Sequence, residues 1–132
     1  MGWTVYYEAH SSDRVLTQAD ADEICVWLEP WTEKLHDGCE GMWMKPRNNG
    51  LWGFTKVQYS SDSRADFLTV IRAIQALAAA RPDLRFTISD DFYITADVEP
   101  MSVGDPETFM ARLDRKFALD PISALDRMFG RS

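Results

Sequence analysis

The chain has 132 residues, of which 45% are hydrophobic and 27% charged, and its formal net charge is -7. This length supplies one hydrophobic core, and the composition excludes a disordered chain. The negative charge disfavours phosphate backbones and anionic lipids, and the chain has no basic leader and no apolar run of roughly 18 residues. We therefore expect a cytoplasmic protein with no nucleic acid and no membrane among its partners.

The chain begins with a predicted strand over residues 3–9, in which aromatic and β-branched residues alternate with period two. After a polar break, Thr17 is the expected N-cap of a helix, because Asp20 and Asp22 in the next turn complement the helix dipole. The apolar residues of this helix recur at helical spacing to about residue 36. Pro30 lies inside the pattern, removes a backbone donor, and should kink or break the helix near Leu28 or Glu29.

A hairpin follows this helix. Residues 42–45 predict a short strand, and residues 51–59 predict a further strand. Between them, Asn48, Asn49 and Gly50 predict a tight turn, because Asn and Gly tolerate positive φ.

The next helix has the clearest apolar stripe in the chain, with serine and aspartate caps at residues 60–63 and an end at Arg81 and Pro82. Its stripe consists of Phe67, Val70, Ile71, Ile74, Leu77 and Ala78. Residues 84–89 and 92–98 then predict two more strands joined by a turn at Asp90 and Asp91.

Two short helices are expected at the C-terminus, because Asp105 and Asp120 each precede a proline and would cap a helix. We divide the chain into a sheet domain over residues 1–100 and a helical extension over residues 101–132, packed on the same domain or on a partner. The predicted fold is α+β: an antiparallel sheet with two helices on one face, the ferredoxin-like split βαβ plan, with an extra C-terminal hairpin strand and two short C-terminal helices.

No combination of residues in the sequence indicates a cofactor or a metal. Cys25 and Cys39 are expected to be reduced, and the neighbouring His36 and Glu40 lack the second ligand pair that structural zinc uses. Phosphate-binding loops and zinc-protease motifs are missing from the sequence. Asp90 and Asp91 supply carboxylates, but a β-turn explains them, so the sequence favours a non-catalytic role.

Residues 52–59 partly resemble the aromatic RNA-binding motif of the RRM family. Gly53, Phe54, Val57 and Tyr59 fit this motif, whereas Trp52 replaces its basic residue. Thr55 and Lys56 depart from the small and aromatic positions that follow. Because the chain carries a net charge of -7, which disfavours phosphate contacts, we interpret the match as the alternation of an ordinary strand.

Surplus aromatics around the predicted hairpin suggest a protein interface, because exposed tryptophans are typical anchors of such surfaces. We expect the interface to contain Trp43, Trp52, Phe54, Asp90 and Asp91. An acidic domain of this kind suits a basic partner, as an inhibitor or immunity-type protein suits a basic enzyme or toxin.

The alternative is a small-molecule-binding domain or enzyme of the dimeric ferredoxin-like type. Its ligand site would lie on the open sheet face, with Tyr6, Glu8 and His10 as the first candidates. Self-association as a homo-oligomer is compatible with either function.

Overall fold

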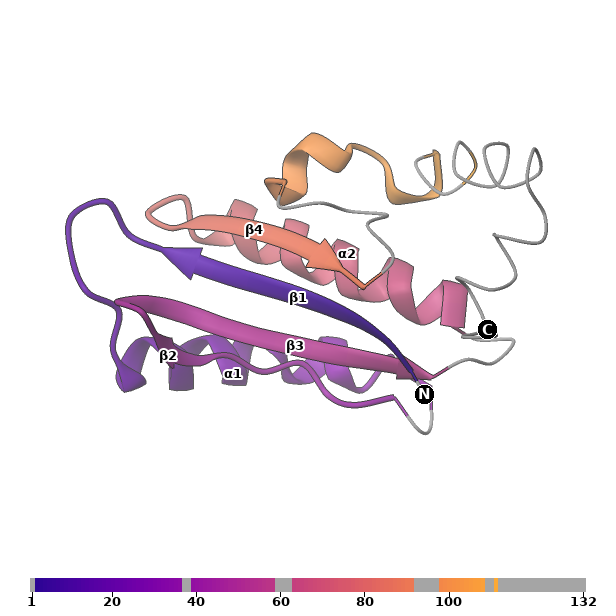
Figure 1. Ribbon diagram of the computed structural model, residues 1–132, viewed down its shortest axis with the longest axis horizontal. Helices are drawn as coiled ribbons and strands as arrows, with labels where there is room; N and C mark the ends of the chain where they lie inside the picture. The colour runs from indigo at the N-terminus through magenta and orange to yellow at the C-terminus, as the bar shows by residue number, and fades with distance from the viewer. Residues whose placement is uncertain (1, 37–38, 59–62, 92–97, 109–110, 112–132) are drawn as a thin grey trace.

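In the computed structural model of the protein, residues 2–36, 39–58, 63–91, 98–108 and 111 are described. The elements are β1 (Gly2–His10), α1 (Gln18–Thr32), β2 (Lys45–Arg47), β3 (Gly50–Gln58), α2 (Ser63–Ala80), β4 (Arg85–Asp90) and the 3-10 helix η1 (Pro100–Val103). The strands form one antiparallel sheet in the order β2-β3-β1-β4 (Figure 1). An α+β fold with an antiparallel sheet is thus confirmed.

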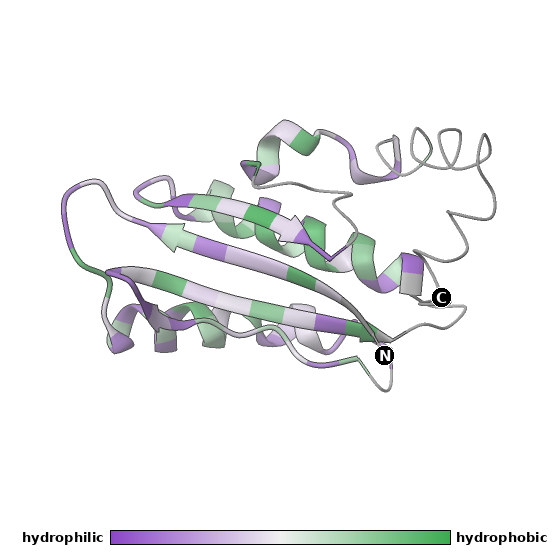
Figure 2. Ribbon diagram, viewed as in Figure 1, coloured by the Kyte–Doolittle hydropathy of each residue, from purple (hydrophilic) through white to green (hydrophobic). Residues whose placement is uncertain are grey.

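The sheet has one buried face and one open face, because successive side chains of a strand point to opposite sides. Along the central strands hydrophobic and hydrophilic residues alternate (Figure 2). Val5, Tyr7 and Ala9 of β1 join buried residues of β3, β4, α1 and α2 in one core. Tyr6 and Glu8 of β1 point the other way, onto a face that no helix of the described chain covers (Figure 1). This second side is called the open face below.

Helix α1 begins where the sequence predicts but does not break at Pro30. Thr17 is its N-cap, and the amide and hydroxyl of Thr17 both donate to the carboxylate of Asp20. The helix continues through Pro30 to Thr32, so of the expected kink or break near Leu28 or Glu29 the break does not occur, and the expected end at residue 36 is four residues too late. Pro30 lies in the last turn on the exposed side, and the helix ends two residues after it.

The hairpin turn is confirmed, but the strand before it was placed too early. Asn48 and Asn49 have φ of 51° and 67°, and they form a two-residue loop between Arg47 and Gly50. The strand predicted over residues 42–45 is instead Lys45–Arg47. Residues 39–44, called the edge segment below, run beside β3 without forming a regular strand, and the Glu40 amide donates to the Lys56 carbonyl at 3.0 Å.

Helix α2 confirms the predicted apolar stripe, with five of its residues fully buried: Phe67, Val70, Ile71, Ile74 and Leu77. Trp27 and Trp31 of α1 are partly buried against the same core. Of the strand predicted over residues 92–98, only Val98 is described, and it forms an isolated bridge with Ile88.

At the start of the helical extension, the Asp105 carboxylate accepts bonds from the amides of Glu107 and Thr108, as the predicted cap requires. The helix predicted after Asp120 lies outside the described residues. Within the described chain, no helix has the length and hydrophobicity to cross a membrane.

Candidate functional site

The edge segment is fixed to the sheet by a buried tyrosine. The Tyr7 hydroxyl lies 2.9 Å from the Thr55 hydroxyl and accepts a bond of 3.2 Å from the Trp43 amide. Thr55 in turn donates to the Gly41 carbonyl at 3.3 Å. Burial raises the pKa of Tyr7 to about 12. These bonds set the position of the Trp43 side chain.

Gly53 allows the edge segment to lie close to β3. A Cβ atom at this position would lie 1.9 Å from the Trp43 carbonyl oxygen and 2.8 Å from the ring of Tyr7. Any residue larger than glycine at position 53 of β3 would therefore clash with the edge segment.

Between α1 and the edge segment lies an open groove of about 500 Å³, called the α1 groove below. Cys25 and Glu29 of α1 line it together with Glu33, the C-cap residue that follows the helix, because residues four apart share one helix face. Cys25 is held there by the Met44 backbone, with Sγ 3.4 Å from the carbonyl oxygen. The groove is lined by Cys25, Glu29, Thr32, Glu33, Gly41, Met42 and Trp43.

The rim of the α1 groove is acidic and its wall aromatic. Glu29 and Glu33 are exposed, and within the described part of the chain neither carboxylate forms an ion pair or a hydrogen bond. Trp43 closes the groove beside them and is half-buried. An acidic rim beside an indole can hold a lysine or arginine through charge and through contact of the cation with the ring.

Three of the residues expected at an interface form one cluster on and beside β3. The ring of Trp43 lies 5.5 Å from that of Trp52 and 4.8 Å from that of Phe54, and Trp52 and Phe54 are 5.3 Å apart. Because they pack against each other, these side chains are half-buried and not fully exposed.

The two aspartates predicted at the interface are separated from this cluster. Asp90 is only 4% exposed, because β4 extends to this residue and its side chain points into the core face. It therefore adds nothing to the surface. Asp91 is exposed, and its carboxylate accepts a bond of 3.0 Å from the Thr4 amide, with β1 between it and the aromatic cluster.

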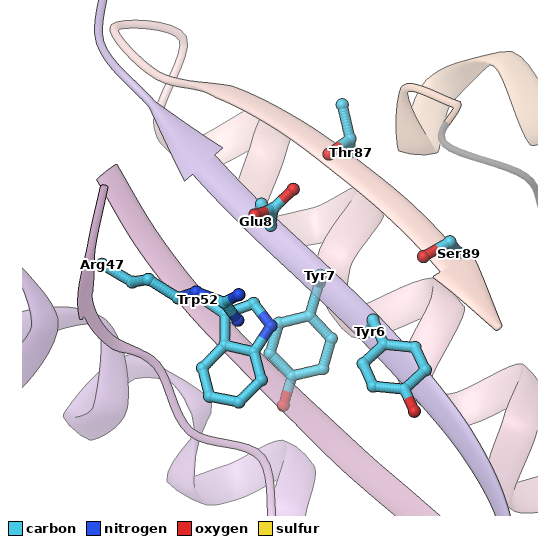
Figure 3. A pocket seen from close by; sticks show the side chains of 7 residues that line it. All are labelled: Tyr6, Tyr7, Glu8, Arg47, Trp52, Thr87 and Ser89. Carbon is cyan, nitrogen blue, oxygen red and sulfur yellow. The ribbon is translucent and has the colours of Figure 1, made fainter. Parts of the chain in front are cut away.

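A second, smaller hollow of about 230 Å³ lies on the open face (Figure 3). Tyr6 and Glu8, two of the three candidate ligand residues, line it together with Arg47, Trp52, Thr87 and Ser89. His10 is exposed at the end of β1 and is not among the lining residues. Burial, then the Asp91 carboxylate, raises the pKa of Tyr6. This hollow is called the sheet-face pocket below.

Sequence reasoning missed Glu29 and Glu33, although a signal was present. Their spacing with Cys25 places all three on one face of the predicted helix, with two acids together. Arg47, Thr87 and Ser89 were also missed, because only the pairing register of four strands shows that they meet.

A polar cluster at the end of α1 lacks the properties of a nucleophilic site. His36 Nδ1 lies 2.7 Å from the carboxylate of Asp66, which is buried. Burial, then the carboxylates of Asp66 and Glu40, raises the pKa of the Cys39 thiol to about 11. A nucleophilic cysteine requires the opposite shift. No group of three acidic, histidine or cysteine side chains among the described residues is arranged to hold a metal ion.

We predict that Cys39 alkylates slowly. At neutral pH its thiolate fraction should be at least about a hundredfold below that of an ordinary cysteine, since the pKa is about 11. The measurement is the rate of iodoacetamide labelling of the folded protein, resolved by peptide mass spectrometry. The rate should match that of an unstructured cysteine peptide after denaturation. Fast labelling of native Cys39 at neutral pH would show that its thiol is activated.

Comparisons of the chain with protein-family models, with curated proteins and with solved structures find no match.

Proposed function

We propose that the protein is a non-catalytic binding module whose α1 groove receives a lysine or arginine of a basic partner protein. The observation that supports this most directly is that Glu29, Glu33 and Trp43 line one open groove. Inhibitor and immunity-type proteins of basic enzymes or toxins act through surfaces of this chemistry, so we place the protein in that functional class, in the cytoplasm.

Charge and shape both favour this occupant. The whole chain carries -7, which speeds the approach of a cationic partner. A side chain in the groove can lay its aliphatic stem along Trp43 while its charged end reaches Glu29 and Glu33. The groove is open along one side, as binding of a side chain from another molecule requires.

The arrangement of the elements also supports the ferredoxin-like plan as part of this proposal. The order β-α-β-β-α-β, with β1 and β3 in the centre of the sheet, is the split βαβ arrangement. In that plan the helices cover one face, so the α1 groove and the open face are separate surfaces.

The proposal is tested by calorimetric titration with an end-blocked tetralysine peptide. The double variant Glu29→Gln/Glu33→Gln should weaken binding roughly tenfold, because it removes both rim charges. The matched control is Asp22→Asn/Glu23→Gln, which removes the same charge from α1 outside the groove and should change affinity less than about twofold.

Equal loss of affinity in both double variants would mean that the peptide responds only to net charge, and would contradict the proposal. So would the absence of binding to the unmodified protein. Raising the salt concentration should weaken the interaction, because exposed charges are screened.

A second candidate function is the binding of a small molecule on the open face. The sheet-face pocket favours it, because the pocket gathers polar side chains of β1, β2 and β4 around Trp52 of β3. Glu8→Gln should then weaken the binding of a small ligand and leave tetralysine binding unchanged.

A further inference from the structure

Two opposite charges line the sheet-face pocket without a protein partner. Glu8 is half-buried near the C-terminal end of β1, and within the described chain its carboxylate forms no ion pair and no hydrogen bond. Arg47 forms no ion pair there either, and its guanidinium carbon lies 4.7 Å from the centroid of the Trp52 ring. The two groups line the same pocket but are not paired with each other.

The pocket therefore contains a carboxylate and a guanidinium that no protein group of opposite charge pairs with in the described chain. A partly desolvated carboxylate without a partner is unfavourable, and a ligand that supplies a donor relieves this cost. The hydroxyls of Thr87 and Ser89 also have no hydrogen-bond partner in the described residues. Both lie on β4, Thr87 opposite Glu8 and Ser89 opposite Tyr6 (Figure 3). A ligand with both a cationic and an anionic end would pair with Glu8 and with Arg47.

The stack on Trp52 prepares Arg47 for an anionic group. Contact with the indole limits the motion of the long arginine side chain, so less entropy is lost when its planar donors bind a carboxylate. A guanidinium offers a carboxylate two parallel hydrogen bonds. Glu8 then accepts from an ammonium group of the same ligand.

We propose that the sheet-face pocket binds a small zwitterion, namely a free α-amino acid, with its carboxylate on Arg47 and its ammonium on Glu8. This rests on the second candidate function and names its ligand class. The volume of about 230 Å³ is below the range of roughly 300 to 1,000 Å³ typical of drug-sized ligands, which suits one amino acid.

A polyanion fits the same surface less well. Lys45 and Arg47 would attract phosphates, but Glu8 lies in the middle of the face and Asp91 at its end. With a net charge of -7, the long-range field also opposes nucleic acid. A zwitterion uses both signs of charge and avoids this repulsion.

The test is a thermal-shift screen of each standard L-amino acid, followed by calorimetry on those that raise the unfolding temperature. At least one should bind saturably to the unmodified protein. Glu8→Gln and Arg47→Gln should each weaken it at least about tenfold. Lys45→Gln is the matched control, because Lys45 Nζ also lies over Trp52, at 5.4 Å, but is not among the residues that line the pocket. It should change affinity less than about twofold.

The N-acetyl amide of the same amino acid lacks both charges and should not bind. Equal binding of this derivative, or binding of neutral monosaccharides in place of amino acids, would overturn the zwitterion assignment while leaving a ligand site on the open face. If neither amino acids nor monosaccharides bind, both the inference and the second candidate function fail. The unfolding temperatures of the free variants show whether each is folded.

Discussion

Replacement of Gly53 by alanine should lower the free energy of unfolding by about 3 kcal/mol or more. The added methyl group would lie 1.9 Å from the Trp43 carbonyl oxygen, so the edge segment has to move away from β3. This movement would also strain the hydrogen bond from the Trp43 amide to Tyr7. Urea denaturation followed by circular dichroism measures the change.

The control is Lys56→Ala, which changes an exposed side chain of β3 between the buried Thr55 and Val57 and should alter stability by less than about 0.5 kcal/mol. If Gly53→Ala unfolds at the same urea concentration as the unmodified protein, the edge segment does not depend on close contact with β3. The α1 groove would then lack a fixed wall.

Replacement of Tyr7 by phenylalanine should cost about 1 to 3 kcal/mol at neutral pH, because the half-buried Trp43 amide and the buried Thr55 hydroxyl each lose a hydrogen bond. The same variant should change the response to alkali. The pKa of Tyr7 is raised to about 12 in the folded protein, whereas an unfolded tyrosine titrates near 10.

Proton binding is linked to folding, and this linkage determines whether stability rises or falls with pH. With a raised pKa, the protonated phenol is favoured by folding, so its contribution is complete below about pH 10 and is lost as the pH rises toward about 12. Over that interval the stability advantage of the unmodified protein over Tyr7→Phe should shrink by as much as about 3 kcal/mol. Urea midpoints at several alkaline pH values measure it. A constant difference between the two proteins would show that Tyr7 is not buried in its neutral form.

Local patterns predicted most of the elements because their causes are local. The Asn48 and Asn49 turn follows from residues that tolerate positive φ, and the apolar stripe of α2 follows from helical periodicity. The strand predicted over residues 42–45 lies at Lys45–Arg47 instead, and the reason is a contact between segments that are distant in the sequence. The missing side chain of Gly53 lets the edge segment approach β3 closely before regular pairing begins at Lys45.

The candidate sites were predictable to the extent that sequence neighbours become spatial neighbours. Trp43 and Trp52 flank one turn, so their contact follows from the hairpin. Asp90 was assigned to a surface turn, but one more residue of β4 places it on the same side as Phe86 and Ile88, because side chains alternate. The α1 groove joins a helix to the edge segment, and that contact depends on the buried Tyr7 bonds, which no local pattern reveals.

The most direct test of the main proposal is to locate tetralysine on the protein by two-dimensional nuclear magnetic resonance. We expect saturable shifts of the Trp43 indole and of the amides of Glu29 and Glu33, and no shifts with end-blocked tetraglutamate. Shifts spread evenly over the acidic surface, or confined to residues outside the α1 groove, would contradict it.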